Sequence, residues 1–198
     1  MPWLGWRVHF TRGRLQLPSE QRSQLAEINV ESISKWLEGR SVSEGSPCLF
    51  APDGGYDVEL NRYFEHSAVR FRSPHTAAAV AYDLADFLTF LWWHREPVGG
   101  GSWKDATPAD RTAYLHWRRK DPDGPRVAGS TWSRSVATVN AFYVWAVAQG
   151  YVASNPILQR EVKSRRGRRA TPAAQTPAEA ARDARRRDTR WLPPESYR

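Results

Sequence analysis

The feature that most constrains the fold of this chain is one stretch, residues 129–156, which reads GSTWSRSVATVNAFYVWAVAQGYVASNP. Its large apolar residues recur at spacings of three and four, so the stretch predicts an amphipathic helix with one face toward a core. Gly150 suits the left-handed position after the last turn, and Pro156 prevents the helix from continuing. The predicted core stripe consists of Trp132, Val136, Val139, Tyr143 and Val147.

The start of this predicted helix is polar and carries one cation. A hydroxyl of Ser130 or Thr131 can cap the first turn by accepting a hydrogen bond from a backbone N–H. Arg134 lies off the core stripe, near the same end. Hydroxyls, a cation and a helix start together suit contacts with phosphate groups and base edges. The alternative for Arg134 is a surface arginine that pairs with a nearby carboxylate. The aromatic residues are predicted to lie in the core rather than to stack on bases: Trp132, Phe142, Tyr143 and Trp145.

Two further helices are predicted before this one. Residues 76–92 carry one apolar face, formed by Val80, Leu84, Phe87, Leu88 and Leu91. Residues 107–119 begin with a capping-box pattern, in which Thr107 caps the first turn, Pro108 takes the first helical position and Asp110 bonds back.

Three capped helices with polar joints predict a mainly all-α fold. The bundle is expected to span residues 73–157, with a flexible glycine connection at 99–101. Residues 1–72 are expected to form a mixed N-terminal extension.

Within that extension, residues 1–18 look irregular, and a helix is predicted at 19–38. A short strand is predicted near 48–51, followed by a turn at Pro52 to Gly55. Residues 58–67 fit a helix or a strand equally well.

Basic charge is concentrated at the C-terminal end. Residues 1–157 hold 17 Lys and Arg against 16 Asp and Glu, whereas residues 158–198 hold 12 against 5, so they carry +7 of the net +8. Such a run predicts a linker, residues 158–190, that lies along a polyanion; a solvated tail is the alternative. Residues 191–198 resemble the truncated start of another domain.

Composition indicates the cellular compartment and argues against a membrane span. Cys48 is the only cysteine, so no internal disulfide can form, and a cytoplasmic location is expected. No stretch approaches the roughly 18 apolar residues that a membrane span requires, and the N-terminus lacks an apolar signal-peptide core. No membrane partner is therefore predicted.

The sequence contains few candidate metal-binding or catalytic residues. None of the five histidines pairs with another His or with Cys48 at a metal-ligand spacing, and no nucleophile elbow occurs. Asp83 and Asp86 lie one turn apart, but a solvated polar face explains them better than acid–base catalysis. We predict no catalytic residue, no metal and no cofactor.

Two segments carry a resemblance to a known family. The first is Ser73-Pro74-His75-Thr76, followed by Asp83-Leu84 and then DFLTFL; the second is STWSR at 130–134, followed by VATVNAFYVWAVAQGYVASNP. Together they resemble the N-terminal core-binding (SAM-like) domain of tyrosine site-specific recombinases, the phage-integrase family. In that family a helical bundle grips the recombination site, and a basic linker crosses the DNA to a separate catalytic domain.

The resemblance implies double-stranded DNA as the partner, with self-association on DNA as a further option. It implies that the first and third helices lie near the major groove and that the linker arginines add sequence-independent affinity. The residues implied to contact DNA are His75, Thr76, Ser130, Thr131, Ser133, Arg134, Arg165, Arg166, Arg168 and Arg169.

We therefore expect the DNA-binding core domain of a recombinase, contributing to DNA recombination and integration without being catalytic by itself. Two alternatives stay open: a truncated integrase that regulates by occupying attachment sites, and a helical protein-interaction module.

Overall fold

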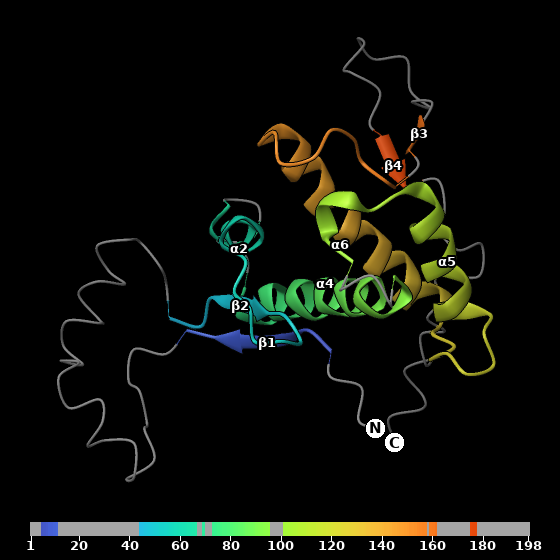
Figure 1. Ribbon diagram of the computed structural model, residues 1–198, viewed down its shortest axis with the longest axis horizontal. Helices are drawn as coiled ribbons and strands as arrows, with labels where there is room; N and C mark the ends of the chain where they lie inside the picture. The colour runs from blue at the N-terminus through green and yellow to red at the C-terminus, as the bar shows by residue number, and fades with distance from the viewer. Residues whose placement is uncertain are drawn as a thin grey trace, which may run out of the picture.

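Helices dominate the part of the chain that the structure describes. The computed structural model describes residues 5–11, 44–66, 69, 73–95, 101–157, 159–161 and 175–177. Its α-helices are α2 (Val58–Glu65), α4 (Pro74–His94), α5 (Pro108–Arg119) and α6 (Gly129–Ala148), with a short 3-10 helix η1 (Trp103–Asp105) (Figure 1). The predicted, mainly helical fold class is confirmed.

Two small antiparallel sheets accompany the helices. In the first, β1 (Arg7–Phe10) pairs with β2 (Pro47–Phe50), with Arg7 opposite Phe50. In the second, β3 (Gln159–Glu161) pairs with β4 (Gln175–Pro177).

Helix α4 occupies the centre of the fold. It packs against α6, α5 and both strands of the first sheet, and in Figure 1 it runs lengthwise beside that sheet while α6 crosses it. Its predicted apolar face is almost fully buried, with Val80 only partly covered. The same core includes side chains from β2 and α2, upstream of the bundle predicted at 73–157: Leu49, Leu60, Tyr63 and Phe64.

The core stripe of α6 differs from the predicted one at its last position. Trp132, Val136, Val139 and Tyr143 are buried, but Val147 is 38% exposed and Ala146 is buried in its place. Spacings of 4, 3, 4 and 3 keep a stripe on one side of a helix with 3.6 residues per turn, and they lead to Ala146. The aromatic residues Phe142 and Trp145 are buried as expected.

The start of α6 corrects a second prediction. Its N-cap is Ala128, which makes no side-chain capping bond, so Ser130 and Thr131 lie inside the first turn instead of capping it. The reason is tertiary: the N–H of Val127 donates to the carbonyl of Arg118 at 2.9 Å, which anchors the chain just before the helix.

The other helix ends follow local rules. Helix α5 has the predicted capping box between Thr107 and Asp110. After α6, Gly150 has a φ of +74°, as predicted. The N–H groups of Gly150 and Tyr151 donate to the carbonyls of Val147 and Ala146, at 3.0 Å each, which is the Schellman arrangement. Helix α4 begins at Pro74, two residues before the predicted start, because the Ser73 hydroxyl caps it by accepting from the Thr76 N–H.

The N-terminal extension is partly described. Strand β2 confirms the predicted strand, and the ambiguous segment is a helix, α2, capped by Asp57. The prediction that residues 1–18 are irregular is wrong for β1, because its partner lies some forty residues away and no local pattern reveals the pairing. The predicted helix at 19–38 lies outside the described residues.

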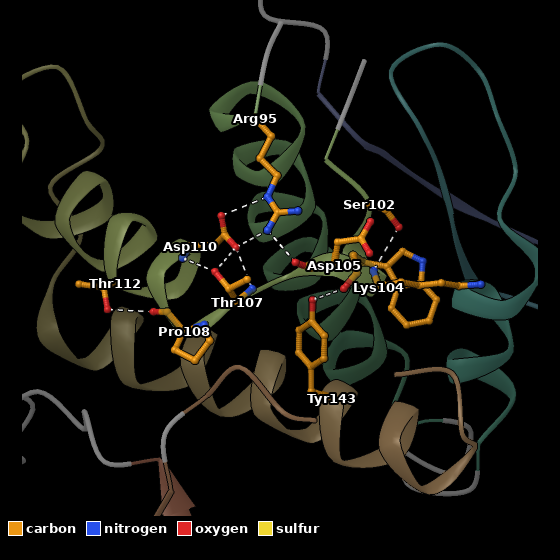
Figure 2. A network of polar contacts seen from close by, with 10 residues as sticks. Arg95, Ser102, Lys104, Asp105, Thr107, Pro108, Asp110, Thr112 and Tyr143 are labelled. Carbon is orange, nitrogen blue, oxygen red and sulfur yellow. Dashed lines mark hydrogen bonds and ion pairs between the residues drawn. The ribbon is translucent and has the colours of Figure 1, made fainter. Parts of the chain in front are cut away.

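A polar network fixes the connection between α4 and α5. Trp103 is 2% exposed, its indole N–H donates to Asp57 Oδ2 at 2.7 Å, and its carbonyl accepts from the Tyr143 hydroxyl at 2.8 Å. Arg95 donates to the Asp110 carboxylate and to the Asp105 carbonyl (Figure 2). A flexible connection was expected at 99–101; residues 99 and 100 lie outside the described residues, and from Trp103 onward these contacts hold the chain in place.

We expect Trp103→Ala to lower the free energy of unfolding by about 3–5 kcal/mol, because it empties a buried aromatic position and breaks the bond to Asp57. Urea denaturation would measure the change. Tyr82→Ala, at an exposed ring, serves as the control and should cost less than about 1 kcal/mol. Equal losses in the two variants would mean that Trp103 does not anchor the connection.

Asp110 should make stability depend on pH. Burial alone would raise the pKa of Asp110, but hydrogen bonds from Arg95 and Thr107 outweigh burial and lower it. The ionised carboxyl therefore stabilises the fold above the unfolded pKa of about 3.9, and this contribution disappears as the pH falls through the lower folded value. Asp110→Asn should cost about 1–2 kcal/mol at neutral pH, and its difference from wild type should narrow toward pH 3. In contrast, Val144→Ala, at an exposed side chain that carries no titratable group, should show no such narrowing.

Candidate nucleic-acid interface

The residues predicted to contact DNA from α4 and α6 lie at the surface. His75 and Ser130 are exposed, while Thr76, Thr131 and Ser133 are half-buried. The Arg134 side chain is 60% exposed. The predicted linker arginines, 165, 166, 168 and 169, lie outside the described residues.

Two of these residues line one groove between α4 and α6. The groove has a volume of about 260 Å³, and Thr76 and Arg134 both border it. Small side chains form much of its wall, so the helices leave space between them. The lining residues are Tyr63, Val69, Thr76, Ala79, Val80, Asp83, Arg134, Ala137, Thr138 and Ala141.

A buried carboxylate organises the polar part of the groove. Asp83 Oδ2 accepts from Arg134 Nε at 2.9 Å, and Oδ1 accepts from Arg134 Nη2 at 3.0 Å. The hydroxyl of Ser135 donates to Oδ1 at 2.8 Å and that of Thr138 to Oδ2 at 3.3 Å. Four donors therefore satisfy a side chain that is only 3% exposed.

The prediction that Asp83 lies on a solvated polar face is wrong. Its partners, Arg134, Ser135 and Thr138, all come from α6, about fifty residues later in the chain. Spacing within α4 carries no information about them. The resemblance singled out Asp83 through the Asp-Leu pair, and that pair was the available signal for this residue.

Electrostatics favour a fixed, charged Arg134. Its hydrogen bonds to Asp83, and the negative charge of that carboxylate, raise the pKa of Arg134 above its usual value. Helix α6 contains no carboxylate, and Arg134 is its one charged residue. The exposed side of α6 therefore presents nothing that repels phosphate.

Asp86 forms a second ion pair from α4, this time to α5. Arg118 Nη1 lies 2.8 Å from Asp86 Oδ2, with the arginine buried and the carboxylate half exposed. Burial raises the pKa of Asp86 despite the opposing effect of Arg118. This pair supports the packing of α5, and the Asp86 carboxylate lies near enough to Arg134 for each charge to influence the pKa of the other group.

The described residues also bear on metal and membrane sites. Across the described ranges, no three His, Cys, Asp or Glu residues gather in a group that could hold a metal ion. Within the same ranges, no helix has the length and apolar character needed to cross a membrane.

Arg134→Ala should destabilise the fold by about 2–3 kcal/mol, because the buried Asp83 carboxylate would keep only two hydroxyl donors. Thermal or urea denaturation would measure the loss. Lys120→Ala, at an exposed position after α5, should change stability by less than about 0.5 kcal/mol. If the two variants were equally stable, Asp83 would not depend on Arg134.

The comparisons with known proteins agree with the geometry. Residues 60–150 match the family model described as phage integrase, N-terminal SAM-like domain. The matched segment contains most of α2 and all of α4, α5 and α6, and so includes the groove. Neither the comparison with curated proteins nor that with solved structures found a match. Residues 60–150 of this chain are therefore a phage-integrase N-terminal SAM-like domain, the core-binding domain that binds DNA in tyrosine recombinases.

Proposed function

We propose that this chain recognises a recombination site in double-stranded DNA through the groove side of α4 and α6. The observation that carries the proposal is Arg134, which is largely exposed at a groove it shares with Thr76. Arginine can donate to guanine O6 and N7, while hydroxyls and helix starts can hold phosphates. His75, Ser130, Thr131 and Ser133 would add contacts at the two helix starts.

The absence of carboxylates on α6 supports this orientation. A helix that enters a DNA groove comes close to phosphates, so acidic side chains on its outer face would oppose binding. The exposed residues of α6 around Arg134 are small, including Ser130, Ala137 and Ala141. They allow the helix backbone to come near the base edges.

The basic linker has a separate role in the proposal. Within the predicted linker, 158–190, β3 pairs with β4, so the residues between these strands would lie along the phosphate backbone. There Arg165, Arg166, Arg168 and Arg169 would add affinity without reading sequence. Strand cleavage would belong to a catalytic domain and not to this segment. A cytoplasmic location and self-association on DNA belong to the same proposal.

One observation favours a second candidate, a protein-interaction module. Val144 and Val147 are exposed on the C-terminal half of α6, and exposed apolar side chains can mark a docking surface. A truncated integrase that occupies attachment sites would use the same DNA surface as the first candidate. Salt dependence separates DNA binding from protein docking.

We expect the slope of log K against log[salt] for duplex DNA to be steeper than about −3, because several phosphates are neutralised. Replacing Arg165, Arg166, Arg168 and Arg169 by alanine should reduce that slope by up to about 3.6, at about 0.9 per lost phosphate contact. Fluorescence anisotropy between about 50 and 200 mM salt would measure both values.

The chain offers a charge-matched control for this experiment. Alanine at Arg182, Arg185, Arg186 and Arg187 removes the same charge from a later part of the tail. A smaller effect of this set would assign the contacts to residues 165–169, whereas equal effects would reduce the linker to a source of net charge. A flat slope for the wild-type chain would favour the interaction module and overturn the proposed function.

A further inference from the structure

We propose that Asp83 is a positioning residue for DNA recognition, which holds Arg134 so that the end of its guanidinium faces a base edge. This inference rests on the proposed function and adds a residue that would not itself touch DNA. It follows from which atoms of Arg134 are already bonded.

Asp83 occupies one edge of the guanidinium. The Nε and Nη2 atoms of Arg134 both donate to the carboxylate, at 2.9 and 3.0 Å. Guanidinium has five N–H donors in a rigid plane, so this bidentate pairing leaves the outer edge, formed by Nη1 and the second hydrogen of Nη2. Among the described residues, none accepts a hydrogen bond from Nη1 of Arg134.

The carboxylate itself is firmly held. Ser135 is fully buried and Thr138 almost so, and their hydroxyls donate to the same two oxygens. Asp83 therefore cannot swing toward solvent without breaking contacts to α6. A long, flexible arginine side chain thereby acquires a defined direction before DNA arrives, which reduces the entropy lost on binding.

The pair also carries no net charge. An isolated arginine attracts any phosphate, but Asp83 cancels that attraction at short range. The outer edge can still form directional hydrogen bonds to guanine. Asp83 should therefore favour sequence discrimination over general affinity.

The small side chains around Arg134 suit contact between its guanidinium and a base edge. Ala137 and Ala141 follow on the same exposed side of α6, and Ala79 and Thr76 face them from α4 across the groove. Their small side chains leave the outer edge of the guanidinium accessible.

The test is a double-variant cycle on DNA discrimination. A duplex selected by the wild-type chain from a random-sequence library would be compared with an unselected duplex of equal length, and the ratio of their affinities recorded. Arg134→Gln should lower this ratio by about tenfold, the value of a bidentate arginine–guanine contact. Asp83→Asn should also lower it by about tenfold, although Arg134 is still present. The double variant should fall no further than Arg134→Gln alone.

A second readout distinguishes positioning from loss of structure. Asp83→Asn removes the neutralising charge, so binding to the unselected duplex should become tighter and its salt slope steeper by about 0.9, one extra phosphate. A variant that was merely misfolded would bind the unselected duplex more weakly. Asp83→Glu, which keeps the charge but shifts the guanidinium, should lose discrimination with an unchanged slope.

Ser135→Ala is the matched control, because it removes a donor from the same carboxylate and leaves the pairing with Arg134 in place. It should lower stability but change the affinity ratio by less than about twofold. The inference is overturned if Asp83→Asn and Asp83→Glu keep wild-type discrimination, if their effects persist in the Arg134→Gln background, or if Ser135→Ala lowers the ratio equally. If the wild-type chain selects no DNA sequence, the proposed function fails together with this inference. If it selects a sequence but the effects of the Asp83 and Arg134 substitutions are independent, this inference alone is overturned.

Discussion

The carboxylate of Asp83 is the contact on which the arrangement of this domain depends. A charged group with 3% exposure is tolerated only when donors surround it, and all of its donors come from α6. The requirement therefore sets where α6 crosses α4. Apolar packing alone would permit neighbouring registers, but only a narrow range of them brings Arg134, Ser135 and Thr138 to one carboxylate.

Helix α4 joins this contact to the rest of the fold. Asp83 pairs with α6, and Asp86, one turn later, pairs with Arg118 of α5. At the far end of α4, Arg95 binds the carboxylate that closes the capping box of α5. One helix thus orients the other two through polar contacts at its surface, while its apolar face fills the core.

The same contact links stability to the proposed recognition. Arg134 satisfies a buried charge on one edge and is exposed on the other, so its substitution affects both folding and binding. Measurements of stability are therefore needed beside any measurement of DNA binding. The resemblance singled out Arg134 as a contact residue, with pairing to a nearby carboxylate as the alternative. The structure contains that pairing and identifies the carboxylate as Asp83.

How much could be predicted from the sequence varied with the range of the interaction. The helices of 76–92 and 107–119 and the turn at Gly150 depend on residues within four or five positions, and the structure contains them. The N-cap of α6, Ala128, and strand β1 depend on partners farther away along the chain, and there the predictions were wrong. For the site, Thr76 and Arg134 were both predicted, and they line one groove; that they contact DNA stays a prediction.

The sequence by itself determined the class of the fold and the helices that build it, because periodicity, caps and helix-ending residues act over a few positions of the chain. It also determined the uneven charge, which is a matter of composition. Only the tertiary structure decided that Asp83 is buried and that Arg134 is held by one edge. Those outcomes depend on two helices about fifty residues apart meeting at a particular crossing, and the need to satisfy a buried charge selects that crossing.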